Sequence, residues 1–332
     1  MWDVRRLSDA ISCGGVAIFF SLTGCFWFRS KKSYGRVVAR FALTVLLPTL
    51  VLVLFAQLLR PWVFSADAWP RDLGTIDPAA LFKGIWQLDY TQWDAAGGHL
   101  WYITHMLEML LCYVPMRLVA THPDKKLRWG VTGLCLVMVL FADLSGWTFL
   151  PESVRSWLPG WKLIFPSYFV MMMLGQELYA NRDRLTGPRK AIPALVLLLL
   201  LTWLRHKLDL ATAPADGSEP LLTITGVFTF LSLPLLYVVF LSLRLPEGLN
   251  EGIRRLSSLT FGVYLVHHLV YVKLSYLGLL PAFALRCEGL TGSAFVNYWV
   301  YAAGTVLLCF AVSALIALPF HLLMKPLRRR LS

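Results

Sequence analysis

Basic side chains gather at every second boundary between the apolar runs of this 332-residue chain, and this alternation constrains the fold more than any other feature. As a helix, a run of about 20 apolar residues spans the roughly 30 Å hydrocarbon core of a membrane. Nine such runs can be read, at residues 10–28, 37–59, 98–119, 127–145, 161–179, 191–206, 220–243, 257–280 and 296–324. Twenty of the 31 Lys and Arg residues lie after the first, third, fifth, seventh and ninth runs, within 29–40, 117–128, 182–190, 244–255 and 325–330.

The positive-inside rule assigns these five basic clusters to the cytoplasm. The amino terminus then lies outside and the carboxyl terminus inside. The pattern predicts an all-α fold, a polytopic transmembrane helix bundle of about nine spans. We expect residues 1–332 to form a single integral domain, multi-pass in a bacterial cytoplasmic (inner) membrane.

The composition excludes several other classes of protein. Charged residues make up 15% of the chain and hydrophobic residues 57%, whereas a soluble domain has about 25% charged residues. The net charge of +12 is distributed between apolar runs and forms no single patch, so we expect anionic membrane lipids as partners and no nucleic acid. Five of the six cysteines fall inside apolar runs and show no metal-ligand spacing, so we expect neither disulfides nor a metal.

The longest polar stretch, Arg60 to Gly98, falls on the outer side and is rich in tryptophan. Its indole side chains suit the headgroup layer of a membrane, where part of the stretch could form an interfacial helix. The alternative is a surface that stacks on sugars, because indole rings pack against apolar faces. The tryptophans in question are Trp62, Trp69, Trp86 and Trp93.

Ionisable residues at membrane depth are functional candidates because their burial is costly. At about 1.5 Å per residue, Glu108 in the third run and His267 and His268 in the eighth run reach a similar depth. His105 lies one turn from Glu108, an i,i+3 pair on one helix face. A carboxylate beside an imidazole can orient it for general acid–base chemistry. The alternative is that these side chains only hydrogen-bond a neighbouring helix and fix its packing.

Arg36 and Arg40 open the second run and are spaced to share one helix face. Two guanidinium groups so placed can bind phosphates bidentately, which would suit coenzyme A arriving from the cytosol. The alternative is an ordinary basic flank of a membrane span. Asp143 and Glu177 lie at the ends of runs, where we expect them to be solvated.

Four stretches together resemble the acyltransferase-3 family of membrane O-acyltransferases, in particular its branch of glucan-modifying and enterobacterial O-acetyl transferases. The most specific is LTFGVYLVHHLVY, which is similar to the family's YLxH signature. The stretches are Ile18–Phe26 (IFFSLTGCF), Gly98–Tyr102 (GHLWY), Tyr168–Leu178 (YFVMMMLGQEL) and Leu259–Tyr271. They cover nearly the whole chain and occur in the family's order.

The resemblance implies a bundle of about ten helices that uses cytosolic acyl-CoA as its donor. It places His267 as the YLxH histidine, beside Tyr264. His99 and Trp101 correspond to the family's HLW motif, and together with Tyr264 they are candidates for binding the substrate. Arg36 and Arg40 correspond to the family's arginine pair, although they are four residues apart here and the family more often spaces them by three.

The start of the chain departs from the family pattern. Members begin with a helix that carries an Arg-Gly turn and then a membrane-embedded histidine taken to be the catalytic base. This chain opens at MWDVRRLSDAIS, which resembles the loop after that helix. We therefore expect this member to lack the first helix, through truncation or as a true feature. The base would then be His267, His268 or His105, with Glu108 orienting it.

The main functional hypothesis is a membrane O-acyltransferase that moves an acetyl or succinyl group from acyl-CoA to a hydroxyl of an envelope carbohydrate. A second hypothesis is a transporter or flippase. Central charges and outer aromatic residues permit it, but the sequence shows no inverted repeat to support it. The third is an inactive, truncated member of the family. The sequence indicates neither the oligomeric state nor the acyl group and acceptor.

Overall fold

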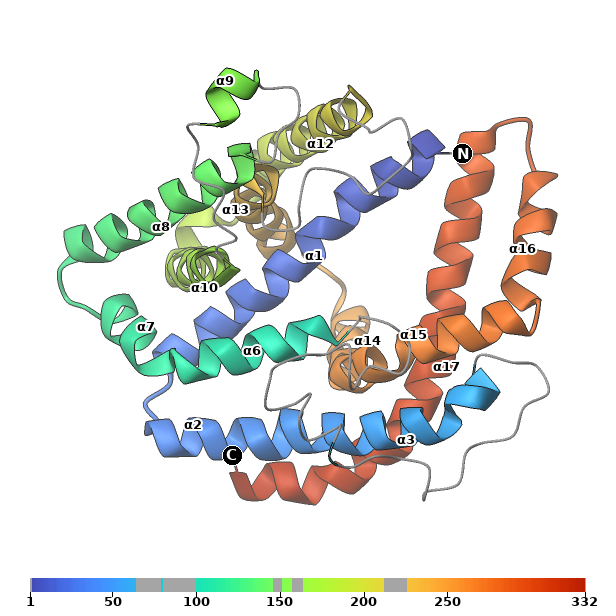
Figure 1. Ribbon diagram of the computed structural model, residues 1–332, viewed down its shortest axis with the longest axis horizontal. Coiled ribbons are helices and arrows are strands. Elements are labelled where there is room, and N and C mark those ends of the chain that lie inside the picture. Colours follow the sequence, from blue (N-terminus) through green and yellow to red (C-terminus); the bar gives the residue numbers. More distant parts are fainter. Residues whose placement is uncertain are drawn as a thin grey trace. The chain divides into compact units, whose positions relative to one another are not determined.

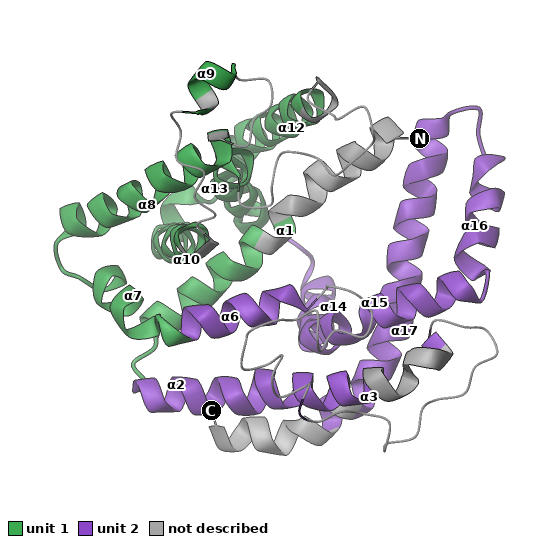
Figure 2. Cartoon of the chain, in the orientation of Figure 1, with its two compact units in different colours: residues 1–32, 111–244 green, residues 33–110, 245–332 purple. Residues whose placement is uncertain are grey.

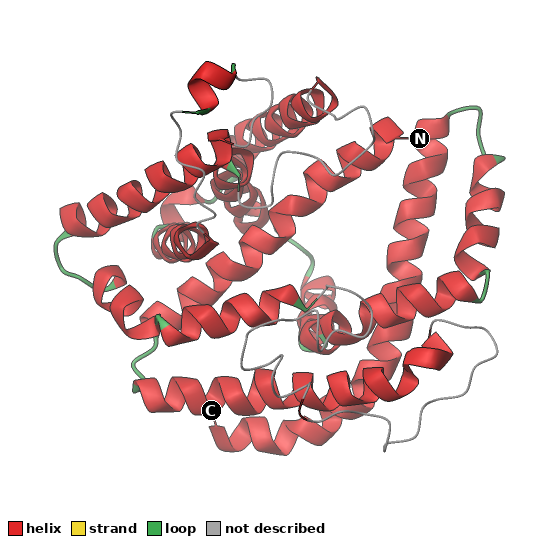
Figure 3. Ribbon diagram, in the orientation of Figure 1, coloured by secondary structure: helices red, strands yellow, loops and turns green. Residues whose placement is uncertain are grey.

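A computed structural model describes residues 2–63, 79, 100–145, 151–156, 164–211 and 226–331. Within these ranges the secondary structure is helical throughout, joined by short turns (Figures 1 and 3). The all-α class predicted from the hydrophobic runs is confirmed. In the outer stretch Arg60 to Gly98, residues 60–63 are helical and residue 79 is also described, whereas Trp69, Trp86, Trp93 and the side chain of Trp62 fall outside what is described, as does His99.

The described part of each of the nine apolar runs lies mainly in a helix or in consecutive helices. They are α1 (Trp2–Arg29); α2 (Tyr34–Phe41), η1 (Ala42–Leu46) and α3 (Leu47–Val63); α6 (Trp101–Leu111) and α7 (Tyr113–Ala120); α8 (Lys125–Ser145); α10 (Ile164–Ala180); α12 (Pro188–Ala211); α13 (Val227–Ser242); α15 (Thr260–Tyr276); and α17 (Ala294–Leu331). The shorter helices between them are α9 (Glu152–Arg155), α11 (Arg182–Leu185), α14 (Glu247–Ser257) and α16 (Leu279–Glu288).

The described helices include several that can cross a membrane. Four are long and apolar enough by themselves: those over Tyr34–Phe55, Lys125–Leu144, Pro188–Leu208 and Ala294–Pro319. The number rises to six if the broken pairs α6–α7 and α15–α16 each count as one span, and α1 and α13 hold shorter apolar segments. The chain is therefore a multi-pass membrane protein. The count of nine spans and their orientation stay predictions.

The contacts of the chain group into two compact units, each made of two separate segments (Figure 2). Unit 1 combines residues 1–32 with 111–244, and unit 2 combines residues 33–110 with 245–332. Each unit is described by itself. The single domain over 1–332 stays a prediction.

In unit 1, helices α1 and α10 cross at backbone contact. A Cβ atom on Gly24 would collide with the backbone of Met172, and one on Gly175 with the backbone of Ser21. Glycine is therefore required on both helices, because any side chain would force their backbones apart. This crossing joins two of the four family-like stretches, Ile18–Phe26 and Tyr168–Leu178.

Polar side chains reinforce the same crossing. The Cys25 thiol donates to the carbonyl of Gly175 at 2.9 Å. The hydroxyl of Ser21 lies 3.0 Å from the hydroxyl of Tyr237 on α13, in a buried contact. Phe20 stacks on the ring of Tyr168 with their centroids 3.9 Å apart. Hydrogen bonds made inside an apolar bundle fix which faces of its helices meet.

Two carboxylates of unit 1 have structural partners, so the expectation that they are merely solvated is wrong. Glu177 accepts a hydrogen bond from the Arg128 guanidinium at 3.1 Å, and both side chains are mostly buried. Asp143 accepts the backbone N–H of Val227 at 3.1 Å and so satisfies a donor in the first turn of α13. The carboxylates thus tie α8, α10 and α13 together.

Unit 2 is built around α3, α15 and α17, with α6 packed on its core. A buried apolar cluster includes Val53, Leu100, Ile103, Leu265 and Val266. A Cβ on Gly262 of α15 would lie 2.7 Å from the Cβ of Ala317 on α17. The small residues at this point allow the two helices to approach closely.

Two local features of unit 2 depart from regular spans. The π-helical turn η1 precedes Pro48, which lacks the N–H that would bond the carbonyl of Thr44 in a regular α-helix. Helix α14 carries the exposed apolar side chains of Leu249, Ile253 and Leu256 along one face. Apolar positions with this spacing and charged ones beside them are typical of a helix in the membrane interface.

Candidate functional site

Helix α6 brings a histidine and a carboxylate into direct contact. The Nδ1 atom of His105 lies 2.9 Å from Oε2 of Glu108, and their side chains are 13% and 34% exposed. This is the i,i+3 pair predicted from the sequence. An ionised carboxylate can only accept, so Nδ1 of His105 carries the proton and Nε2 of the neutral ring holds a lone pair.

Trp101 completes the surroundings of this imidazole on α6. Its indole ring meets the His105 ring edge to face, with centroids 5.6 Å apart. It also meets the ring of Tyr102 at 6.5 Å. The indole of Trp101 and the carboxylate of Glu108 thus both contact the His105 ring, which restricts its rotation.

Helix α15 orients a second imidazole through its own backbone. The Nδ1 atom of His267 lies 2.7 Å from the carbonyl oxygen of Tyr264. A carbonyl is only an acceptor, so this nitrogen is the donor, and the lone pair of neutral His267 is on Nε2. The ring of His267 also lies beside that of Tyr264, with centroids 5.9 Å apart. Both His105 and His267 therefore hold the tautomer that a general base acting through Nε2 requires.

The two helices meet through aromatic rings, all within unit 2. The ring of Tyr102 on α6 meets the ring of Tyr264 on α15 edge to face, at 5.8 Å between centroids. Both rings pack against the buried cluster that contains Ile103 and Leu265. The other two family-like stretches, Gly98–Tyr102 and Leu259–Tyr271, thus contact each other.

His268 belongs to a different environment from that of His267. Its ring lies beside Tyr271, with centroids 6.5 Å apart and planes 24° from parallel. Adjacent residues of an α-helix point about 100° apart, so only one of the two can face a given neighbour. Because Tyr264 neighbours His267 and also contacts α6, His267 is the stronger candidate for chemistry.

Arg36 and Arg40 are both exposed on α2, one turn apart. The hydroxyl of Tyr34 donates to the carbonyl of Leu110 at 3.2 Å, which fixes the start of α2 to the end of α6. The hydroxyl of Thr44 donates to the carbonyl of Arg40 at 2.7 Å, where η1 begins. The two guanidinium groups therefore lie on a helix that is fixed at its start and continues into a π-turn. Such π-turns are often found at functional sites.

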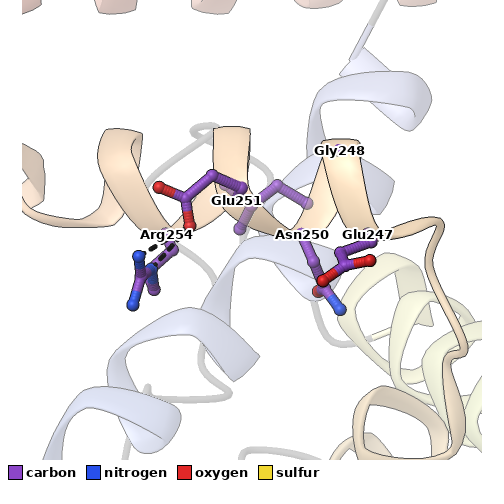
Figure 4. Close-up of a pocket in the computed structure, with 6 residues that line it drawn as sticks. Glu247, Gly248, Asn250, Glu251 and Arg254 are labelled. Carbon is purple, nitrogen blue, oxygen red and sulfur yellow. Dashed lines mark hydrogen bonds and ion pairs between the residues drawn. The ribbon is translucent and has the colours of Figure 1, made fainter.

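A surface hollow of about 730 Å³ lies along α14 in unit 2 (Figure 4). Glu247, Asn250 and Glu251 line it, and Figure 4 shows Glu251 paired with Arg254. Glu251 also accepts from Arg255 at 2.9 Å. The carboxylates that line the hollow would repel a phosphate group, so the exposed arginines of α2 are better suited to bind a phosphate-bearing ligand.

Sequence reasoning missed the partners that hold these groups. The bond from His267 to a carbonyl three residues earlier is local, and the eighth run gave no signal for it beyond the histidine itself. The contact between Tyr102 and Tyr264 depends on how helices pack, and a single sequence carries no direct record of that. Buried Lys273 on α15 was also missed, although a lysine inside an apolar run is a signal in itself.

The chain matches a known protein family. A family model described as an acyltransferase domain, Acyl_transf_3, covers residues 1–318 of the chain. Neither the curated proteins nor the solved structures contain a match. The family match spans both units and all four of the stretches from which the resemblance was drawn.

Proposed function

Because this chain belongs to the acyltransferase-3 family, we propose that it moves an acyl group, acetyl or succinyl, from cytosolic acyl-CoA to a hydroxyl of an envelope carbohydrate in the bacterial inner membrane. The observation that carries this proposal is the pair of imidazoles in unit 2, each held with its Nδ1 as the donor. A membrane acyltransferase needs such a base because a sugar hydroxyl is a weak nucleophile until its proton is removed.

The proposed reaction is a direct transfer. The Nε2 atom of an imidazole takes the proton of the acceptor hydroxyl as its oxygen attacks the thioester carbonyl. The new C–O bond forms the ester, the C–S bond breaks, and the departing thiolate of coenzyme A recovers the proton from the imidazolium. We assign the base to His105 because the carboxylate of Glu108, 2.9 Å from its Nδ1, orients the ring directly.

His267 and Tyr264 are proposed to bind the acceptor from α15, with Nε2 of His267 accepting a hydrogen bond from the acceptor hydroxyl. The hydrogen bond from His267 to the Tyr264 carbonyl fixes the ring. Trp101 and His99 of the HLW-like stretch are proposed to bind the acceptor, since indole rings pack against sugar faces. His268 is kept as a lesser candidate.

Arg36 and Arg40 are proposed to hold the phosphates of acyl-CoA. We expect Arg36→Ala and Arg40→Ala each to raise the KM for acyl-CoA by about 10- to 100-fold, the effect of losing a charge-assisted hydrogen bond. Arg40→Lys should recover only part of the loss because an ammonium cannot form the bidentate fork. Initial rates over a range of donor concentrations measure both. The control is Arg189→Ala, because Arg189 is an exposed arginine of α12. An equal rise in the KM for acyl-CoA in that variant would refute the phosphate-binding role of Arg36 and Arg40.

The proposed reaction itself is tested in membranes that contain this chain. We expect label from acetyl-CoA or succinyl-CoA to enter envelope glycans as an alkali-labile ester, and matched membranes without the chain to show none. Parallel uptake and efflux assays without coenzyme A test the transport hypothesis. Solute movement without acyl transfer would overturn the proposal in favour of a transporter. Folded protein that does neither would correspond to an inactive member of the family.

A further inference from the structure

Helix α14 of unit 2 has no buried residue against the part of the chain that the structure describes. It is eleven residues long, and in water a helix of this length is only marginally stable on its own. Gly248 and Gly252 weaken it further, because glycine is a poor helix former and a Cβ at either position would meet nothing within 4 Å. Packing against the described protein therefore does not account for this helix.

One side of α14 is apolar. Leu249, Ile253 and Leu256 follow each other at intervals of four and three residues, so they share one helix face. Their side chains are 52%, 46% and 48% exposed. Three large apolar side chains gathered on so short a helix favour a surface that removes them from water.

The other side of α14 is polar and pairs its own charges. The carboxylate of Glu251 accepts from Arg254 at 2.7 Å and from Arg255 at 2.9 Å, and Figure 4 shows the first of these pairs. With Glu247, the helix carries two acidic and two basic side chains, so its net charge is zero. The apolar face, and not a charge, therefore determines what α14 contacts.

The chain on each side of α14 keeps it close to the membrane. Residues 243–246 separate it from the end of α13, and Ser258 and Leu259 separate it from the start of α15. Helix α13 is apolar, and α15 belongs to a broken pair that can form one span. Four extended residues reach at most about 14 Å. The surface within reach of the apolar face is therefore that of the bilayer.

We propose that α14 lies in the plane of the membrane interface, with Leu249, Ile253 and Leu256 inserted at the boundary of headgroups and acyl chains and with Glu251 facing water. The partner of this face is the lipid bilayer, and the balanced charges select no particular headgroup. Because two residues link α14 to α15, the depth of α14 also fixes the depth at which α15 begins. The inference holds whether or not the chain transfers acyl groups.

Photocrosslinking of the full-length chain in phosphatidylcholine vesicles tests this proposal. The photoreactive residue p-benzoylphenylalanine replaces Ile253 on the apolar face or, as the control, Glu247 on the polar face. We expect about tenfold more lipid adduct from position 253 than from position 247, and the same ratio after phosphatidylglycerol is added to the vesicles. Equal adducts from both positions would overturn the proposal. So would crosslinks from 253 to a second copy of the chain or to another protein segment, and so would lipid adducts that require phosphatidylglycerol.

Hydrogen exchange in the same vesicles gives an independent measurement. We expect Ile253→Asp to speed exchange of the backbone amides of 251–257 by about tenfold or more, because the helix then loses its contact with lipid. Ile253 is exposed, so the change leaves the core of unit 2 intact. Asn250→Asp adds the same carboxylate outside the apolar face and should leave exchange unchanged. Equal exchange in the two variants would refute insertion of this face.

Discussion

Replacing Gly175 with leucine is expected to prevent unit 1 from folding, and Gly175→Ala should already lower its stability by about 1–3 kcal/mol, the usual penalty for overpacking. The Cβ of any residue here meets the backbone of Ser21. A side chain could rotate away from such a clash, but a helix backbone cannot, so α1 and α10 must separate. Separation weakens the stack of Phe20 on Tyr168 and the thiol bond of Cys25.

The measurement is the thermal unfolding midpoint in detergent, together with the yield of monodisperse protein. Gly133→Ala is the matched control because Gly133 is also helical and a Cβ there meets nothing within 4 Å. In a helix interior that change should stabilise by up to about 1 kcal/mol. If Gly175→Ala and Gly133→Ala gave the same midpoint, the backbone contact between α1 and α10 would be refuted.

Gly24 offers a further check on the same crossing, since its Cβ would meet the backbone of Met172. Gly24→Ala alone should resemble Gly175→Ala. The double variant should lose less than the sum of the two single losses, because the first substitution already separates the helices. Full additivity would mean that the two glycines act at independent places.

The helices were predictable because hydropathy identifies the segments that can lie in a bilayer. Such a segment must satisfy its own backbone hydrogen bonds, as a helix does. The described part of each apolar run from 10–28 to 296–324 falls mainly on a helix or on consecutive helices. The basic residues near the ends of the runs were also seen, but not their structural bonds. Arg128, for example, pairs with Glu177, and the sequence offered only a charge in a positive cluster.

Interruptions of the helices were predicted less well because they depend on backbone details. The π-turn at 42–46 follows from the missing N–H of Pro48, a cause that is visible in the sequence but not in a hydropathy profile. The break at Cys112 within the third run has a similar marker, because Pro115 lacks the N–H that would bond the carbonyl of Leu111 in a regular α-helix. Helix α14 falls in a short gap between runs and is marked only by the spacing of Leu249, Ile253 and Leu256.

The candidate site divides in the same way between local and long-range features. The contact of His105 with Glu108 was predictable because residues three apart always neighbour each other on a helix. The contact of Tyr102 with Tyr264 was not, because it depends on which faces of α6 and α15 meet. The similar membrane depth predicted for Glu108 and His267 indicated that both helices were candidates, but only their packing shows which side chains touch.

The proposed role of the His105–Glu108 pair predicts a loss of about 10²- to 10⁴-fold in kcat for His105→Ala, the usual contribution of a general base. Glu108→Gln should lose a comparable factor, because an amide neither fixes the same tautomer nor stabilises the imidazolium. The double variant should be no worse than His105→Ala, since the two residues act as one unit. Steady-state rates of labelled acyl transfer measure all three variants.

A purely structural pair would behave differently in this series. Loss of packing would lower the amount of folded protein and leave kcat per folded molecule unchanged, whereas loss of the base lowers kcat with little effect on the KM for acyl-CoA. His122→Ala, in the turn between α7 and α8, should retain full activity. If His267→Ala lost 10²-fold or more while His105→Ala stayed active, the base would be His267 on α15, and the carboxylate on α6 would serve packing alone.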